Sequence, residues 1–165
     1  MDIRISKSEL NKALSLTQSI VERKTTMPIL TNVLLSASEG ELKVSATDLE
    51  ITAVTRAVAD VTEGGSTTVN AKVFSDIVRE LPEGDVTLKL LEQERLLIET
   101  DKTKMRMIGV SAEEYPSLPG IGMNVTNKIS SSQLSEMVAK TLYAVSTDET
   151  RFNLNGVCFS IASGE

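Results

Sequence analysis

The chain has 165 residues, of which 41% are hydrophobic, and a net charge of −6, so it suits one globular domain plus part of another and carries no surplus of basic charge. It contains no histidine, which removes the commonest general base, the commonest metal ligand and every Ser–His or Cys–His nucleophile. With no Trp, two Tyr and three Phe it offers few rings for stacking single-stranded bases, and no apolar run approaches the ~20 residues of a membrane span.

The first third of the chain predicts a strand, a helix and three strands. Polar and apolar residues alternate at the start, and apolar residues from Leu10 to Val21 then recur at helical spacing. Glu39-Gly40 is typical of a turn between two of the later strands. The predicted elements are a strand over 2–6, a helix from Ser8 to Val21, and strands over 30–37, 41–47 and 51–59.

The same order of elements repeats after a predicted loop at 62–66. The second helix has one apolar face, and the stretch PEG at 82–84 is expected to end it. The predicted elements are a strand over 67–71, a helix over 72–81, and strands over 86–91, 95–100 and 104–110. A strand-helix-three-strand motif used twice favours an α+β fold with the helices on one face of antiparallel sheets.

A longer internal repeat appears when the sequence is shifted by 124 positions. Residues 1–41 then align with 125–165 without a gap, and 12 of the 41 pairs are identical. A period of this length is typical of a duplicated domain rather than of a solenoid repeat. We therefore expect that the chain comes from a parent protein of at least two units. In this chain we expect a complete first domain over 1–122, a linker over 123–126 and the incomplete start of a second domain over 127–165.

In the second domain the repeat predicts a strand, a helix and a further strand over Val157–Ile161. The single cysteine, Cys158, falls in that last strand, so we expect a small buried hydrophobe rather than a reactive thiol. No basic segment followed by an apolar stretch begins the chain. These features predict a cytoplasmic protein.

Three charged stretches each permit a structural and a functional interpretation. Arg23 and Lys24 follow the first helix, where cations complement the helix dipole. Asp48 and Glu50 can hold a metal or act as acid and base, but a side-chain-to-backbone turn is commoner at such a site. Charges along the strand 104–110 protect an exposed sheet edge, or mark an edge that pairs with another chain.

The polar faces of the two predicted helices carry small uncharged residues and a few cations. A solvated surface explains such faces without any function, but the small side chains also leave room for a polyanion to approach. The predicted faces hold Lys7, Asn11, Lys12, Ser15, Gln18 and Ser19 on the first helix, and Lys72, Ser75, Asp76, Arg79 and Glu80 on the second.

Several stretches together resemble the bacterial sliding clamp family, the beta subunit of DNA polymerase III. They are MPILTNVLL with GELKVSATDLEI, KVFSDIVRELPEG with ERLLIETDKTKMRM, and RFNLNGV. The resemblance runs over the whole chain and implies a protein of three similar domains, two copies of which close into a ring around duplex DNA. In such a ring the helices line the hole and the sheets form the outer wall, so the polar helix faces would point toward DNA.

The resemblance also assigns residues to roles. Lys24 matches a basic loop residue that contacts DNA, and Lys72 and Arg79 match basic residues of the second inner helix; Arg23 and Lys12 complete the predicted DNA-binding set. The strand edge that pairs with the other subunit corresponds to Lys104, Met105, Arg106, Met107 and Ile108. Arg151 and Leu154 match residues that edge the pocket for peptides of the polymerase and the clamp loader.

The sequence departs from the family pattern in two places. The loop before RFNLNG carries Asp148 and Glu149 where the family often has a second DNA-contacting polar residue, and acidic groups would repel phosphate. We therefore expect no DNA contact from that loop. Phe152-Asn153 stands where an aromatic pair can occur, so that part of the pocket wall is expected to differ.

We therefore expect a non-enzymatic processivity factor that acts as a homodimeric ring, without cofactor, metal or membrane contact. A ring holds DNA topologically, so sparse contacts to phosphate that ignore base sequence suit it. One alternative is a peptide-binding adaptor of the same fold that never encircles DNA. The other is a metal-dependent hydrolase using Asp48 and Glu50, which the lack of histidine and of a third clustered ligand disfavours.

Overall fold

The computed structural model describes residues 1–21, 27–118, 128–148 and 150–160. Its contacts divide the chain into two compact units, Met1–Pro119 and Gly120–Glu165. Among the described helices none is long and apolar enough to cross a membrane.

The first unit follows the predicted order, a strand-helix-three-strand motif used twice. The first motif comprises β1 (Asp2–Ser6), α1 (Lys7–Gln18), β2 (Asn32–Ser38), β3 (Glu41–Thr47) and β4 (Thr52–Val58). The second comprises β6 (Gly65–Asn70), α2 (Ala71–Glu80), β7 (Asp85–Leu91), β8 (Arg95–Glu99) and β9 (Lys104–Val110). A short strand β5 (Asp60–Glu63) joins them, and the single turns η1 (Pro28–Thr31) and η2 (Ala112–Glu114) precede β2 and follow β9.

The nine strands form one sheet in the order β4-β3-β2-β6-β9-β8-β7-β1-β5, with every described pair antiparallel. The first strand of each motif lies with the strands of the other motif. β1 pairs with β7, and β6 pairs with β2. This exchange ties the two halves together, whereas the direct junction of β6 with β9 consists of only Thr68–Val110 and Val69–Gly109.

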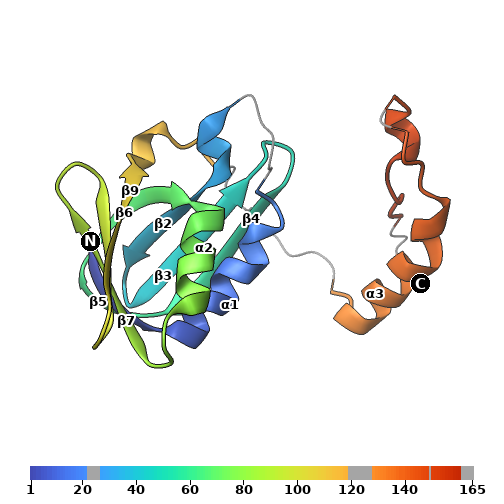
Figure 1. The fold of residues 1–165 in the computed structure, drawn as a ribbon. Helices are drawn as coiled ribbons and strands as arrows, with labels where there is room; N and C mark the ends of the chain where they lie inside the picture. Colours follow the sequence, from blue (N-terminus) through green and yellow to red (C-terminus); the bar gives the residue numbers. More distant parts are fainter. Residues whose placement is uncertain (22–26, 119–127, 149, 161–165) are drawn as a thin grey trace. The chain divides into compact units, whose positions relative to one another are not determined.

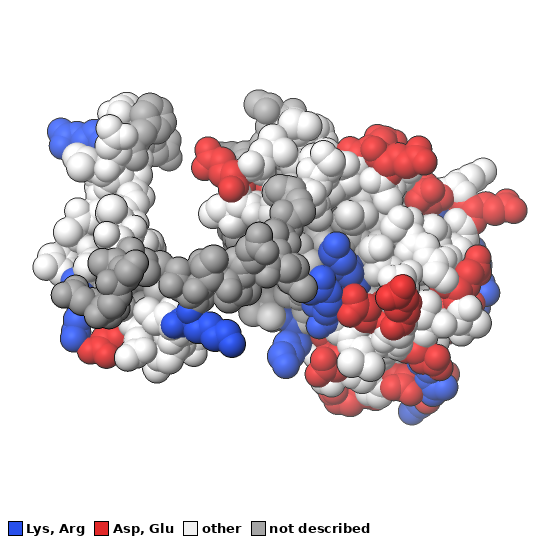
Figure 2. Space-filling view, turned by 180° about the vertical axis from the view of Figure 1, so that it is seen from behind, with Lys and Arg blue, Asp and Glu red and all other residues white. Residues whose placement is uncertain are grey.

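Both helices lie side by side over one face of the sheet (Figure 1). Ser6 caps α1 by accepting a hydrogen bond from the Glu9 backbone N–H, and Asn70 caps α2 by accepting one from Val73. Alternate strand residues and the inner faces of the helices share one core, whose largest fully buried side chain is Phe74 of α2. On the opposite face of the first unit, acidic side chains occur at several separate places (Figure 2).

Several predictions for the first unit were wrong in detail. The first helix ends at Gln18 rather than Val21, because Ile20 donates its N–H to Thr17 in a tighter closing turn. Pro28 starts the 3₁₀ turn η1, which delays β2 to Asn32. The edge strand β5 was missed, because its four residues run into the glycine-rich stretch that was interpreted as loop.

In the second unit the predicted helix is confirmed as α3 (Ser131–Thr141), followed by the turns η3 (Leu142–Ala144) and η4 (Phe152–Leu154). The two predicted strands are not: residues 128–130 and 157–160 are not in strands. An isolated strand gains no ladder hydrogen bonds, and the described part of this unit offers it no partner. Cys158 is therefore exposed, not buried as predicted.

Candidate nucleic-acid interface

The faces of α1 and α2 that turn away from the sheet form one continuous candidate surface. α1 buries Leu10, Ala13, Leu14 and Thr17, and α2 buries Ala71, Phe74, Ser75 and Val78. Ser75 was predicted to lie on the polar face, but it is 2% exposed and donates a hydrogen bond of 3.2 Å to the Gln18 side chain. A serine at this position lets the two helices approach and join through a polar contact.

The exposed face of α1 contains the small polar residue Ser15, and the exposed Ser19 follows as the C-cap of the helix, as predicted. Lys12 is also exposed, and it forms no ion pair with any described residue. Sequence reasoning missed Leu16, which is 58% exposed among these polar groups. The buried residues of α1 are Leu10, Ala13, Leu14 and Thr17, and Leu16 falls outside this helical spacing. That mismatch is the signal that could have identified Leu16 as exposed.

On α2 a single carboxylate contacts both cations of that helix. Lys72 Nζ lies 2.6 Å from one oxygen of Asp76, and Arg79 Nη1 lies 3.4 Å from the other. The hydrogen bond from Lys72 is the main cause that lowers the pKa of Asp76, and the charges of Lys72 and Arg79 lower it further, so the carboxylate is ionised near neutrality. Spacings of three and four residues on a helix predict such pairs.

An open hollow is lined by residues from the end of α1 and the start of α2. Its wall is largely apolar but includes hydroxyl, amide and ammonium groups; the lining residues are Ser15, Gln18, Ser19, Val21, Thr31, Asn70, Ala71 and Lys72. The predicted contact residues Arg23 and Lys24 fall outside the described residues. The polar residues of the hollow add hydrogen-bond donors to the helical surface.

Asp48 has a structural role in the turn between β3 and β4. Its Oδ1 accepts hydrogen bonds from the backbone N–H groups of Glu50, at 2.9 Å, and Ile51, at 2.6 Å. The carboxylate is thus occupied by the turn, as the structural interpretation predicted. In the part of the chain that the structure describes, no three Asp, Glu or Cys side chains are grouped to hold a metal.

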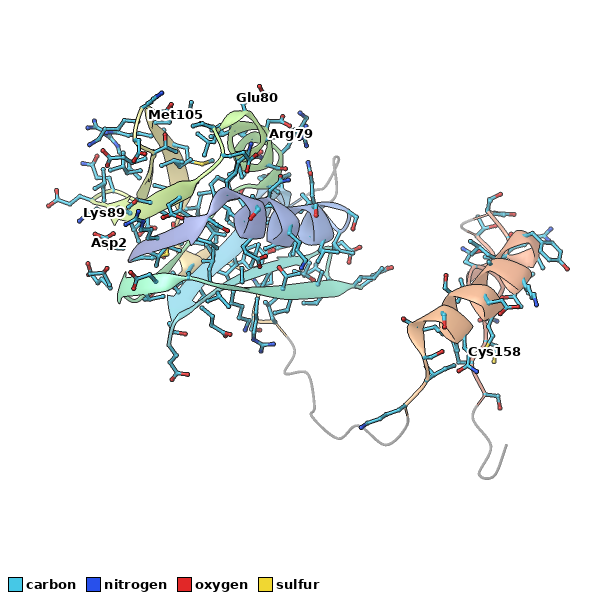
Figure 3. The ribbon with its side chains drawn as sticks, turned by 90° about the horizontal axis from the view of Figure 1, so that it is seen from below. Asp2, Arg79, Glu80, Lys89, Met105 and Cys158 are labelled. Atoms are coloured by element: carbon cyan, nitrogen blue, oxygen red, sulfur yellow. The ribbon has the colours of Figure 1, made fainter. Side chains whose placement is uncertain are left out.

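The strand β9 has one edge that is only partly paired. It pairs with β8 from Lys104 to Ile108, but β6 meets it only at Gly109 and Val110 because the chain then enters α2. Along this edge Ile108 is 79% exposed and Met105 is 37% exposed, whereas Met107 points into the core. Met105 is labelled in Figure 3.

In the second unit Arg151 and Leu154 lie in one turn, where the Leu154 N–H donates to the Arg151 carbonyl at 2.8 Å. Leu154 is exposed, and Arg151 Nε lies 3.4 Å from Asp148 Oδ2. Hydrogen bonds from the Thr150 hydroxyl and backbone lower the pKa of Asp148. The acidic loop residue is thus charged and adjacent to the predicted pocket residue; Glu149 lies outside the described residues.

Residues 1–119 match the family model described as the DNA polymerase III beta subunit, N-terminal domain. The chain is 36% identical over 159 residues to the beta sliding clamp of Caulobacter vibrioides (strain NA1000 / CB15N), covering 95% of this chain and 43% of that protein. It is 32% identical over 164 residues to the beta sliding clamp of Chlamydia muridarum, covering 99% of this chain and 45% of that protein. The chain thus spans less than half the length of these relatives.

The solved structure of the Caulobacter crescentus pol III beta superposes with a TM-score of 0.88 at 36% identity, over 94% of this chain and 42% of that one. The beta subunit of Streptococcus pyogenes, at 21% identity, shares the fold with a TM-score of 0.89, over 94% of this chain and 43% of that one. The two-motif sheet with its helices on one face is therefore the sliding-clamp fold. The chain belongs to the DNA polymerase III beta subunit family.

Proposed function

We propose that this chain is part of a DNA-tethering processivity factor, a homodimeric ring that slides on duplex DNA and holds the replicative polymerase. The observation that carries the proposal is the exposed face of α1 and α2, where a few cations stand among small polar side chains and Lys12 has no described ion-pair partner. Such a surface supplies weak contacts to phosphate that ignore base sequence, which is what a topologically held ring requires.

The proposed DNA-binding residues are Lys12, Arg23, Lys24, Lys72 and Arg79. The proposed dimer edge is Lys104, Met105, Arg106, Met107 and Ile108 on β9; its unpaired backbone groups can accept a strand of another chain, and Ile108 supplies exposed apolar surface. Arg151 and Leu154 are proposed to edge a pocket for peptides of the polymerase and the clamp loader.

We further propose that 1–122 is a complete clamp domain, and that 127–165, after a linker over 123–126, begins a second. The role is non-catalytic and needs no cofactor, and the proposed compartment is the cytoplasm. The turn formed by Asp48 argues against the hydrolase alternative, because its Oδ1 already accepts hydrogen bonds from two backbone N–H groups.

The proposal is tested by loading the full-length protein onto a nicked circular duplex with a clamp loader and ATP. We expect the protein to elute with the circle in gel filtration and to separate from a linear duplex of the same length. A peptide-binding adaptor of the same fold would elute apart from both forms, and that result would contradict the proposal.

A further inference from the structure

Three basic residues of the proposed DNA-binding set lie in the described part of the helical face, and two of them share one acidic partner. Asp76 is 44% exposed at its side chain and contacts both Lys72 and Arg79, whereas Lys12 has no such partner among the described residues. Removal of this single carboxylate would therefore release both α2 cations at once.

The ion pairs on α2 contribute little to stability. Their side chains are 73%, 44% and 59% exposed for Lys72, Asp76 and Arg79, so solvent screens the attraction between the charges. The neighbouring Glu80 is also exposed but forms no ion pair with any described residue. Figure 3 shows Arg79 and Glu80 at the same end of α2. The position of Asp76, three and four residues from the two cations, therefore matters for charge rather than for folding.

We infer that Asp76 restrains the grip of the helical face on DNA by competing with phosphate for Lys72 and Arg79. The inference rests on the proposed function and adds a regulatory residue to the same site. A cation that is already paired must break its contact with Asp76 before it binds a phosphate, so each DNA contact is weaker and exchanges faster. Lys12 keeps its full attraction for phosphate.

The test compares Asp76→Asn with Glu80→Gln in the full-length protein. Each variant removes one negative charge from α2, but only the first releases paired cations. The probe is a short linear duplex, and binding is measured over a series of salt concentrations. For Asp76→Asn we expect affinity to rise about fivefold or more at low salt, and the slope of log K against log salt to steepen by about 1 to 2, roughly 0.9 for each new phosphate contact. For Glu80→Gln we expect the smaller rise of a general charge effect and an unchanged slope.

Adding Lys72→Gln to Asp76→Asn is expected to remove about half of the gain in slope. Equal behaviour of Asp76→Asn and Glu80→Gln, or no gain with Asp76→Asn, would overturn the inference. Retention of the unmutated ring on circular duplex is measured in parallel. If the ring is retained and Asp76→Asn behaves as Glu80→Gln does, only the role of Asp76 fails; if the ring is not retained, the proposed function itself fails.

Discussion

Lys12 is the described basic residue of the helical face that is free to bind phosphate, since Lys72 and Arg79 are both paired with Asp76. We expect Lys12→Gln in the full-length protein to lower duplex affinity and to reduce the salt slope by about 0.9. Stability should change by less than ~0.5 kcal/mol, because the side chain is exposed. The measurement is duplex binding over a salt series.

The matched control for Lys12 is Lys43→Gln. Lys43 alternates along β3 with the buried Leu42 and Val44, so it lies on the sheet face away from the helices. The Lys43→Gln variant loses the same single positive charge as Lys12→Gln. An equal loss of affinity in the two variants would show that DNA responds only to net charge, and would contradict the assignment of DNA to the helical face.

Asp48 stabilises the turn between β3 and β4 through the hydrogen bonds that its carboxylate accepts from the backbone. We expect Asp48→Ala to lower the free energy of unfolding by about 1–2 kcal/mol, because two backbone N–H groups lose their acceptor. Asp48→Asn keeps an acceptor oxygen and should lose less. Denaturant unfolding measures both; equal stability of Asp48→Ala and the unmutated protein would contradict the structural role.

Gly109 controls the junction between the two halves of the sheet, where β6 meets β9. A Cβ at this position would lie 2.6 Å from the Thr68 carbonyl oxygen and 2.9 Å from that of Glu94, both backbone atoms that cannot move aside cheaply. We expect Gly109→Ala to destabilise the protein by about 1–3 kcal/mol, measured by denaturant unfolding. Gly156 is the control, because a Cβ added there would meet no described residue within 4 Å other than its chain neighbours; a similar effect of Gly156→Ala would contradict this explanation.

The element order of the first unit could be predicted because each helix and most strands carry a local period. The pairing of β1 with β7 and of β6 with β2 could not, since both motifs contain the same kinds of strand and only long-range packing selects the partner. Residues 157–160 show that local composition is not sufficient to predict a strand. Their composition favours a strand, but no described partner lies beside them. In the candidate site the cations were predicted, whereas their shared partner Asp76 was noted only as part of a polar face.

The two units of the chain differ in how well they bury their apolar residues. No residue of α3 is buried, and Met137, Leu142 and Tyr143 are all more than half exposed. In this chain we therefore expect backbone amides of 131–141 to exchange with solvent much faster than those of 41–47, where most side chains are buried. Hydrogen exchange measures this; slow exchange in both segments, at a concentration where the chain is monomeric, would show that the second unit is stable without further cover.

The proposed function requires that the protein hold DNA by enclosing it, with the α1 and α2 faces toward the duplex. The most direct measurement follows the full-length protein, already loaded on a circular duplex, after a restriction enzyme cuts the circle once. We predict rapid release from the linear product, and retention when both new ends are blocked by bound protein. Equal retention on the cut circle with free ends and with blocked ends would contradict enclosure, because direct contacts alone would then hold the DNA.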